Sequence, residues 1–146
     1  MLTRKFFFSV VIYILISIPI AFGQQLTVAA AANLQAVMPI LQADFKKRTG
    51  ISADIIIGSS GKLVAQISNG APYDVFLSAD MELPEKLYKD GATLAKPVIY
   101  ATGSLIICSI NKKSLTNWQQ VLTDPQVKKI AIANPSVAPY GAAAME

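Results

Sequence analysis

Three short apolar runs, separated by amphipathic stretches, dominate the first eighty residues. Residues 26–30, 51–57 and 74–78 have the apolar character of buried strands in a parallel sheet. Apolar side chains spaced three or four apart predict a helix over 34–48 and another over 62–69. Strands and helices that alternate through short connections predict an α/β fold, with helices covering the faces of a parallel sheet.

Residues at the expected helix ends refine this pattern. Pro39 should kink the first helix or restart it after one turn, and Gly50 should end it. Asp80 is placed to cap a further helix over 82–90.

The pattern changes near Pro97, and we interpret residues 97–104 as the crossing into a second domain. The elements expected beyond it are two extended runs (98–101 and 104–110), a short helix over 118–122 capped by Asn117, a buried strand over 127–133, a loop through 134–141 and the start of a helix over 142–146.

The first 23 residues have the features of a secretory signal peptide. Two basic residues precede an almost wholly apolar run over 6–22, and the small residues Ala21 and Gly23 favour cleavage before Gln24. A membrane anchor is the alternative, but the run is short for a span. We therefore expect an exported, periplasmic mature chain.

Charge and composition exclude several classes of function. The formal net charge is +4. Without the leader residues Arg4 and Lys5, eleven basic residues stand against nine acidic ones, which leaves +2. The basic residues form no stripe that would indicate nucleic-acid binding. The chain has no histidine, which excludes Ser-His-Asp and Cys-His catalysis and the commonest zinc sites. Its single cysteine, Cys108, lies in an apolar run and is expected to be a buried small residue.

The turn GSSGKL, residues 58–63, has the composition of an oxyanion-binding turn. Its glycines allow close backbone approach, and its position at a helix start leaves N–H groups unpaired beside the hydroxyls of Ser59 and Ser60. The alternative is an ordinary capped helix start, because serine is a preferred N-cap.

Two other turns share this context. Asn33 and Tyr140, like the Ser59–Ser60 pair, each follow an expected strand and precede an expected helix. Such turns gather at the carboxyl ends of parallel strands, where α/β proteins bind ligands, and helix N-termini there favour anions. Neutral donors of this kind suit a fully deprotonated anion.

Catalytic interpretations of the same residues are weaker. The turn is neither G-x-S-x-G nor a Walker loop. Asp74 and Asp80 could form a carboxylate pair, but such residues more often cap turns and helices.

The chain resembles the periplasmic molybdate-binding proteins, the solute receptors of ABC-type molybdate importers. The stretches that carry the resemblance are LTVAAAANL (26–34), GSSGKL (58–63), GAPYDVFLSAD (70–80), and ANP with APYG within 133–141.

That resemblance implies a type II periplasmic-binding-protein-like α/β fold, in which two lobes of parallel or mixed sheet with flanking helices hold the oxyanion between them. Residues 24–97 would belong to lobe I, and 98–146 would form the crossover and an incomplete lobe II, because the family chain runs on past Glu146. It further implies that Asn33 and Ser60 donate to the oxyanion, with Ala32 and Ser59 as neighbours, and that Tyr140 donates its backbone N–H. These residues would contact the oxyanion rather than the metal atom.

The function implied is a non-enzymatic, monomeric receptor that binds molybdate, and also tungstate, and delivers it to an ABC transporter permease without any cofactor. A receptor for another oxyanion, such as sulfate or phosphate, is an alternative in the same class. An extracytoplasmic enzyme or sensor domain on the same fold is another, which the lack of histidine and of any nucleophile–base pair argues against.

Overall fold

The computed structural model describes residues 25–110 and 114–146. The predicted signal peptide, residues 1–23, and its cleavage site lie outside the described residues. Among the residues described, no helix is both long and apolar enough to cross a bilayer.

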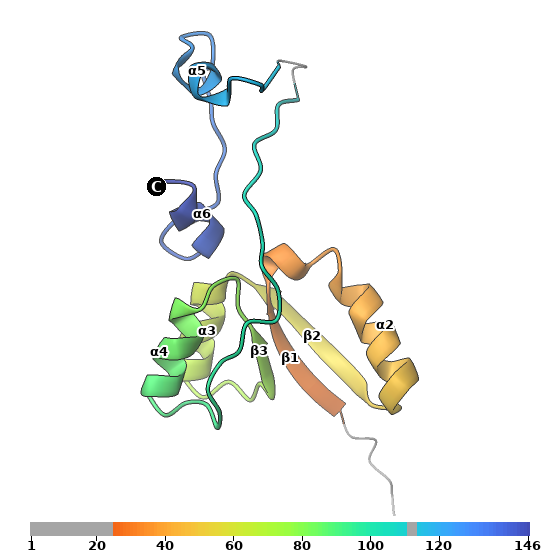
Figure 1. Ribbon diagram of the computed structural model, residues 1–146. Helices are drawn as coiled ribbons and strands as arrows, with labels where there is room; N and C mark the ends of the chain where they lie inside the picture. The colour runs from red at the N-terminus through yellow and green to blue at the C-terminus, as the bar shows by residue number, and fades with distance from the viewer. Residues whose placement is uncertain (1–24, 111–113) are drawn as a thin grey trace, which may run out of the picture.

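A three-stranded parallel sheet forms the centre of the N-terminal part of the molecule (Figure 1). Strand β1 (Gln25–Ala31) lies between β2 (Ser52–Gly58) and β3 (Val75–Leu77). The expected parallel α/β arrangement is therefore confirmed. All three strands point the same way, so the turns that follow them meet at one edge of the sheet.

Helices cover both faces of this sheet. Helix α2 (Met38–Thr49) packs on β2, whereas α3 (Ser60–Ser68) packs on β1 (Figure 1). Helix α4 (Glu82–Lys89) packs against α3. The order β2-β1-β3 explains the two layers, because right-handed connections that leave in opposite directions place their helices on opposite faces. The unit made of β1–β3 and α2–α4 is called the α/β body below.

Side chains along β1 point alternately to the two faces of the sheet, and both sets are part of the core of the α/β body. Val28 and Ala30 pack with Met38 of α2 and Ala53 of β2. Ala29 and Ala31 alternate to the other face of the strand, on the side of α3, where Leu63 is also buried. Small residues on the central strand therefore allow helices to approach from both sides.

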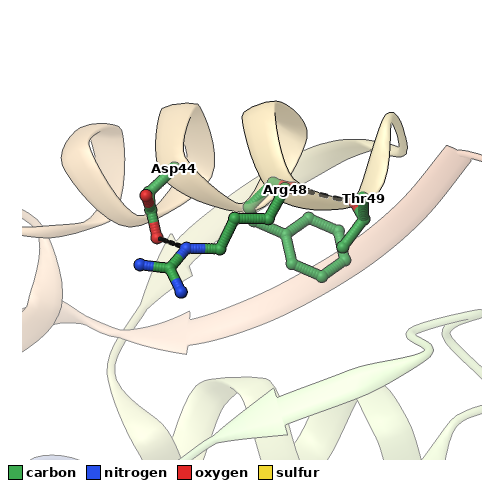
Figure 2. A network of polar contacts seen from close by, with 4 residues as sticks. Asp44, Arg48 and Thr49 are labelled. Atoms are coloured by element: carbon green, nitrogen blue, oxygen red, sulfur yellow. Dashed lines mark hydrogen bonds and ion pairs between the residues drawn. The ribbon is translucent and has the colours of Figure 1, made fainter.

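The helix expected over 34–48 is divided in two, as expected from the position of Pro39. A 3₁₀ turn, η1 (Ala32–Leu34), precedes α2, and Pro39 stands in the first turn of α2, where its missing N–H costs nothing. Gly50 ends the helix with a left-handed φ of 73°, and its N–H donates to the carbonyl of Lys46. Near this end Arg48 pairs with Asp44 at 2.6 Å, and the Thr49 hydroxyl donates to the carbonyl of Phe45 (Figure 2).

The predicted burial of β2 is wrong. Ile56 is 40% exposed and Ile57 37%, whereas Ile55 is half-buried. The reason is topological, since β2 lies at the edge of the sheet and not at its centre. An apolar run indicates a strand but does not say which neighbours will cover it.

The buried strand predicted over 127–133 is also absent. In the described part of the chain these residues join no sheet, and Ile130 and Ile132 are exposed. The extended run over 104–110 likewise makes no ladder, and Cys108 on it is exposed rather than buried. A strand requires the backbone of a partner, and no described segment offers one here.

Two short helices complete the described chain (Figure 1). Helix α5 (Trp118–Thr123) begins after Asn117 as expected, although the Asn117 side chain makes no capping hydrogen bond. Helix α6 (Pro139–Ala143) begins three residues before the predicted 142, because Pro139 occupies its first position, for which proline is preorganised. Tyr140 therefore lies in the first turn of a helix and not in a loop.

Candidate functional site

A small cavity of about 170 Å³ lies where the three strands end. It is lined by residues that follow β1, β2 and β3 and by the segment that leads into α6, and it is open on one side. The lining residues are Ala31, Ala32, Asn33, Ser59, Ser60, Ala79, Ala133, Ala138, Pro139 and Tyr140. The structure therefore brings together all of the site residues expected from the sequence.

The position of this cavity follows from the strand order. Connections from the neighbouring strands leave for opposite faces of the sheet, which opens a crevice at the carboxyl ends of the strands. Asn33 reaches the cavity from η1, directly after β1, and Ser60 reaches it from the first residue of α3. Tyr140 approaches from α6 and closes the other side.

Ser60 is the most deeply buried polar residue of the cavity, with 1% of its surface exposed. Its Oγ accepts a hydrogen bond from the backbone N–H of Ala79 at 3.1 Å. The hydroxyl hydrogen remains available, because a serine hydroxyl can accept and donate at once. The alternative that Ser60 merely caps its own helix is wrong, since its oxygen binds the turn after β3 instead.

Ser59 occupies the N-cap position of α3 but does not behave as a cap. Its backbone is extended (φ −69°, ψ 144°), yet its side chain makes no capping hydrogen bond. Its Oγ is buried without a hydrogen-bond partner among the described residues. A buried polar atom without a partner costs free energy, so this hydroxyl has hydrogen-bonding capacity that the described chain leaves unused.

Asn33 and Tyr140 meet across the cavity. The Asn33 Nδ2 donates a long hydrogen bond, 3.4 Å, to the Tyr140 hydroxyl. Gly103, in the extended segment before α5, leaves room for that hydroxyl, because a Cβ at this position would lie 1.9 Å from it. Gly103 was not identified from the sequence, since only the fold brings residue 103 next to residue 140.

A second contact joins the same two sides of the cavity. The backbone N–H of Gly61 in α3 donates to the carbonyl of Val137 at 3.2 Å. This bond and the Asn33–Tyr140 contact tie the segment over 133–141 to the α/β body, and together we call them the seam.

Among the described residues, none of those that line the cavity has a charged side chain. Its polar groups are the amide of Asn33 and the hydroxyls of Ser59, Ser60 and Tyr140, and the start of α3 adds the positive end of a helix dipole. In the described part of the chain, no three His, Cys, Asp or Glu residues gather as a metal-ion site. The arrangement suits an anion held by neutral donors.

The two aspartates weighed as a carboxylate pair have structural partners instead. Asp74 accepts from the backbone N–H of Thr27 at 2.7 Å. Asp80 accepts from the Ser78 hydroxyl at 3.0 Å and from the N–H of Leu83 at 3.3 Å. It therefore binds the first turn of α4 as a cap would, although the N-cap position of that helix is Met81.

A larger groove of about 680 Å³ adjoins the cavity and shares Asn33, Ala79 and Tyr140 with it. It runs between β3 and the extended segment over 96–103. There Tyr100 donates its hydroxyl to the carbonyl of Ser78 at 2.8 Å. Burial, and secondarily the nearby Tyr140, raises the pKa of Tyr100 above its usual value of 10.0.

Several lining residues were not expected as site residues. Ala79 was missed although it follows the third strand and so lies at the same edge of the sheet as the other turns. Ala133, Ala138 and Pro139 carry no side-chain chemistry that would distinguish them in a sequence. Ala133 ends the apolar run over 127–133, which forms no strand, and Ala138 and Pro139 lie in the loop that follows it.

Comparison with known proteins gives consistent matches over most of the chain. The family model of the bacterial extracellular solute-binding proteins matches residues 26–146. Molybdate-binding protein ModA of Azotobacter vinelandii is 42% identical over 123 residues, which are 84% of this chain and 49% of that protein. The Rhodobacter capsulatus ModA is 38% identical over 133 residues, which are 90% of this chain and 52% of that protein.

A solved structure supports the same comparison. The A. vinelandii periplasmic molybdate-binding protein superposes with a TM-score of 0.73 at 43% identity, covering 82% of this chain and 52% of that one. This match places the fold among the type II periplasmic binding proteins, as the resemblance implied. The chain spans about half the length of the relatives it matches.

Proposed function

Because this chain belongs to the bacterial extracellular solute-binding proteins, we propose that it is a receptor for molybdate, held in the cavity at the carboxyl ends of the strands. The observation that carries the proposal is the convergence of Asn33, Ser59, Ser60 and Tyr140 on one small cavity with no charged lining residue. The names of the relatives point to the same ligand.

The size of the cavity and the polar residues around it support a tetrahedral dianion as ligand, although the surface that faces the cavity in the ligand-free structure is almost wholly apolar. A volume of about 170 Å³ accommodates several groups of the size of a water molecule, and molybdate presents four oxygens. Ser60 would donate its hydroxyl hydrogen, since its oxygen already accepts from Ala79. Ser59 would find in the ligand the partner that it otherwise lacks.

The absence of a carboxylate from the lining favours molybdate over phosphate. Near neutral pH phosphate keeps a proton and needs an acceptor, whereas molybdate only accepts. A donor facing another donor in a buried site costs about 1–3 kcal/mol. Sulfate carries the same charge as molybdate and would have to be excluded by size.

The remaining features of the proposal follow from the family. The protein would act in the periplasm as a monomeric, non-enzymatic receptor, would also accept tungstate, and would pass its ligand to an ABC transporter permease. Residues 24–97 would form the first lobe, and residues 98–146 the crossover and part of the second.

Thermal unfolding in the presence of molybdate, tungstate, sulfate and phosphate tests this function. A ligand that binds only the folded protein raises its stability by RT ln(1 + [L]/Kd), about 2.7 kcal/mol at one hundred times Kd. We expect molybdate and tungstate to raise the unfolding midpoint at concentrations where sulfate and phosphate do not. A shift by sulfate or phosphate alone would assign the receptor to that anion instead.

Ser60→Asp tests whether this cavity is the site. The new carboxylate can still accept from the Ala79 amide, but it sets a negative charge against a dianion, so molybdate binding should be abolished. Ser68→Asp is the matched control, because it adds the same charge at the exposed far end of α3. Near-normal molybdate affinity in Ser60→Asp would remove this cavity from the proposal.

A further inference from the structure

We propose that Gly61 is a specificity-determining residue, which sets the spacing between the two sides of the cavity and thereby discriminates molybdate from the smaller sulfate. This inference rests on the proposed function. Gly61 does not line the cavity and would not touch the anion, so it would act as a positioning residue.

The geometry at the seam carries the argument. The Gly61 N–H reaches the Val137 carbonyl at 3.2 Å, so two backbones meet with no side chain between them. A Cβ at position 61 would lie 3.2 Å from both the Cα and the carbonyl oxygen of Val137. Each of these distances is tighter than an ordinary contact, and the atoms belong to the backbone, so the backbone at Val137 would have to shift away by a few tenths of an ångström.

The conformation of Gly61 does not itself call for glycine. The glycines with left-handed φ angles are Gly50, Gly70 and Gly91, whereas Gly61 stands in the first turn of α3. Within a helix glycine is less favourable than alanine, because it loses more backbone freedom on folding. Close approach to Val137 is the feature of the structure that accounts for glycine here.

The Gly61–Val137 bond of the seam lies directly beside the two groups of residues that face each other across the cavity. Gly61 is adjacent in sequence to Ser60, and Val137 is adjacent to Ala138, and both neighbours line the cavity. The backbone contact therefore fixes how far the donors of α3 stand from the residues at the start of α6. An anion that fits this separation contacts both sides at once, and a smaller dianion cannot.

Gly61→Ala, with Gly61→Val as a larger step, tests the inference. Molybdate affinity is measured by calorimetry and sulfate affinity by competition against molybdate, each beside the wild-type protein. We expect molybdate to bind about tenfold more weakly in Gly61→Ala, the effect of roughly one lost hydrogen bond to a charged group, and still more weakly in Gly61→Val. The affinity for sulfate, which does not contact both sides of the cavity, should change less. The ratio of molybdate affinity to sulfate affinity should therefore fall.

Unfolding of the ligand-free variants separates positioning from folding. In Gly61→Ala the better helix propensity of alanine and the crowding against Val137 act on the unfolding midpoint in opposite directions, so we expect a small net change and cooperative unfolding, while the molybdate affinity falls. Ala65→Val is the matched control, because it adds bulk to an exposed position of the same helix and should leave both affinities unchanged.

The outcomes distinguish this inference from the proposed function. Unchanged affinities in Gly61→Ala, or an equal fall for both anions, would overturn the role of Gly61 while wild-type molybdate binding stands. Loss of cooperative unfolding in Gly61→Ala would also overturn it, because the glycine would then be required by the fold as a whole. A wild-type protein that does not bind molybdate would overturn the proposed function itself.

Discussion

Two adjacent serines differ entirely in what surrounds their hydroxyls. The oxygen of Ser60 is held by the Ala79 amide, whereas the oxygen of Ser59 is buried without a partner in the described chain. One hydroxyl is therefore held in place by the fold, whereas the other has no partner among the described residues. Substitutions at the two positions should have opposite effects on the ligand-free protein.

Ser60→Ala should weaken molybdate binding by roughly 1–3 kcal/mol, the range for a hydrogen bond to a charged group, and should also destabilise the free protein, because the Ala79 amide loses its acceptor. Calorimetry and urea unfolding measure the two effects separately. Intact stability would show that Ala79 finds another partner.

Ser59→Ala should raise the stability of the ligand-free protein, by up to about 1 kcal/mol, because it removes a buried hydroxyl without a partner. The same change should weaken molybdate binding. A fall in the urea midpoint of the ligand-free variant would contradict this expectation and would mean that Ser59 is satisfied in solution without a ligand.

Tyr140→Phe should be mild. The contact that it removes is the long one, 3.4 Å, between the hydroxyl and Asn33, and the backbone amide proposed as a donor is retained. Molybdate affinity should fall by less than tenfold, or about 1.4 kcal/mol. A larger loss would make the hydroxyl itself a ligand group, and Asn33→Ala, which removes the amide, provides the comparison.

At the scale of elements, the α/β body depends on how its helices begin and end. Asp80 ties the start of α4 through the Leu83 amide, and Gly50 ends α2 through a left-handed turn. Asp80 thus fixes the turn that follows β3 at the edge of the sheet where the cavity lies, whereas Gly50 sets the connection that leads into β2. The exposed pair between Asp44 and Arg48 lies within one helix and contributes little by comparison.

Asp80→Ala should therefore cost about 1 kcal/mol of stability, the usual effect of losing a cap, whereas Asp80→Asn should cost less because it keeps an acceptor. Asp44→Ala, which removes only the exposed ion pair in Figure 2, should cost no more than about 0.5 kcal/mol. Urea unfolding of the three variants would refute this ranking if Asp44→Ala proved the most damaging.

For the whole molecule, the extended segment that leaves the α/β body is held by Tyr100, whose hydroxyl donates to the Ser78 carbonyl at 2.8 Å. Donation requires the protonated phenol. Because burial, and then Tyr140, raises the pKa of Tyr100, the folded protein binds this proton more tightly than the unfolded chain does. The segment is thus attached to the body by a bond that only strongly alkaline conditions would remove.

The sign of this shift gives a pH prediction. The stability contributed by Tyr100 is complete below the unfolded pKa of 10.0 and is lost as the pH rises through the higher folded value. Chemical unfolding of wild type and Tyr100→Phe across alkaline pH should show the two stability curves converging. Parallel curves over that range would mean that Tyr100 does not contribute.

Local pattern was sufficient for much of the fold and for the members of the candidate site. Apolar runs and helical spacing located β1–β3 and α2–α4 to within a few residues, and Pro39 and Gly50 marked the division and end of a helix correctly. Asn33 and Ser60 could be grouped because turns after parallel strands must share an edge, whereas Tyr140 joins them although the strand expected before it is absent. These features are encoded in residue type and spacing over a few neighbouring positions.

Only the tertiary structure decided what lies next to each of these residues. Burial of Ile56 depended on whether β2 was central or at the edge, and burial of Cys108 on a strand partner that no described segment supplies. The bond from Ala79 to Ser60 and the approach of Val137 to Gly61 join residues far apart in sequence. Periodicity determines which face of an element is apolar, but the neighbours that cover it, or leave a hydroxyl free, come from the packing of the whole chain.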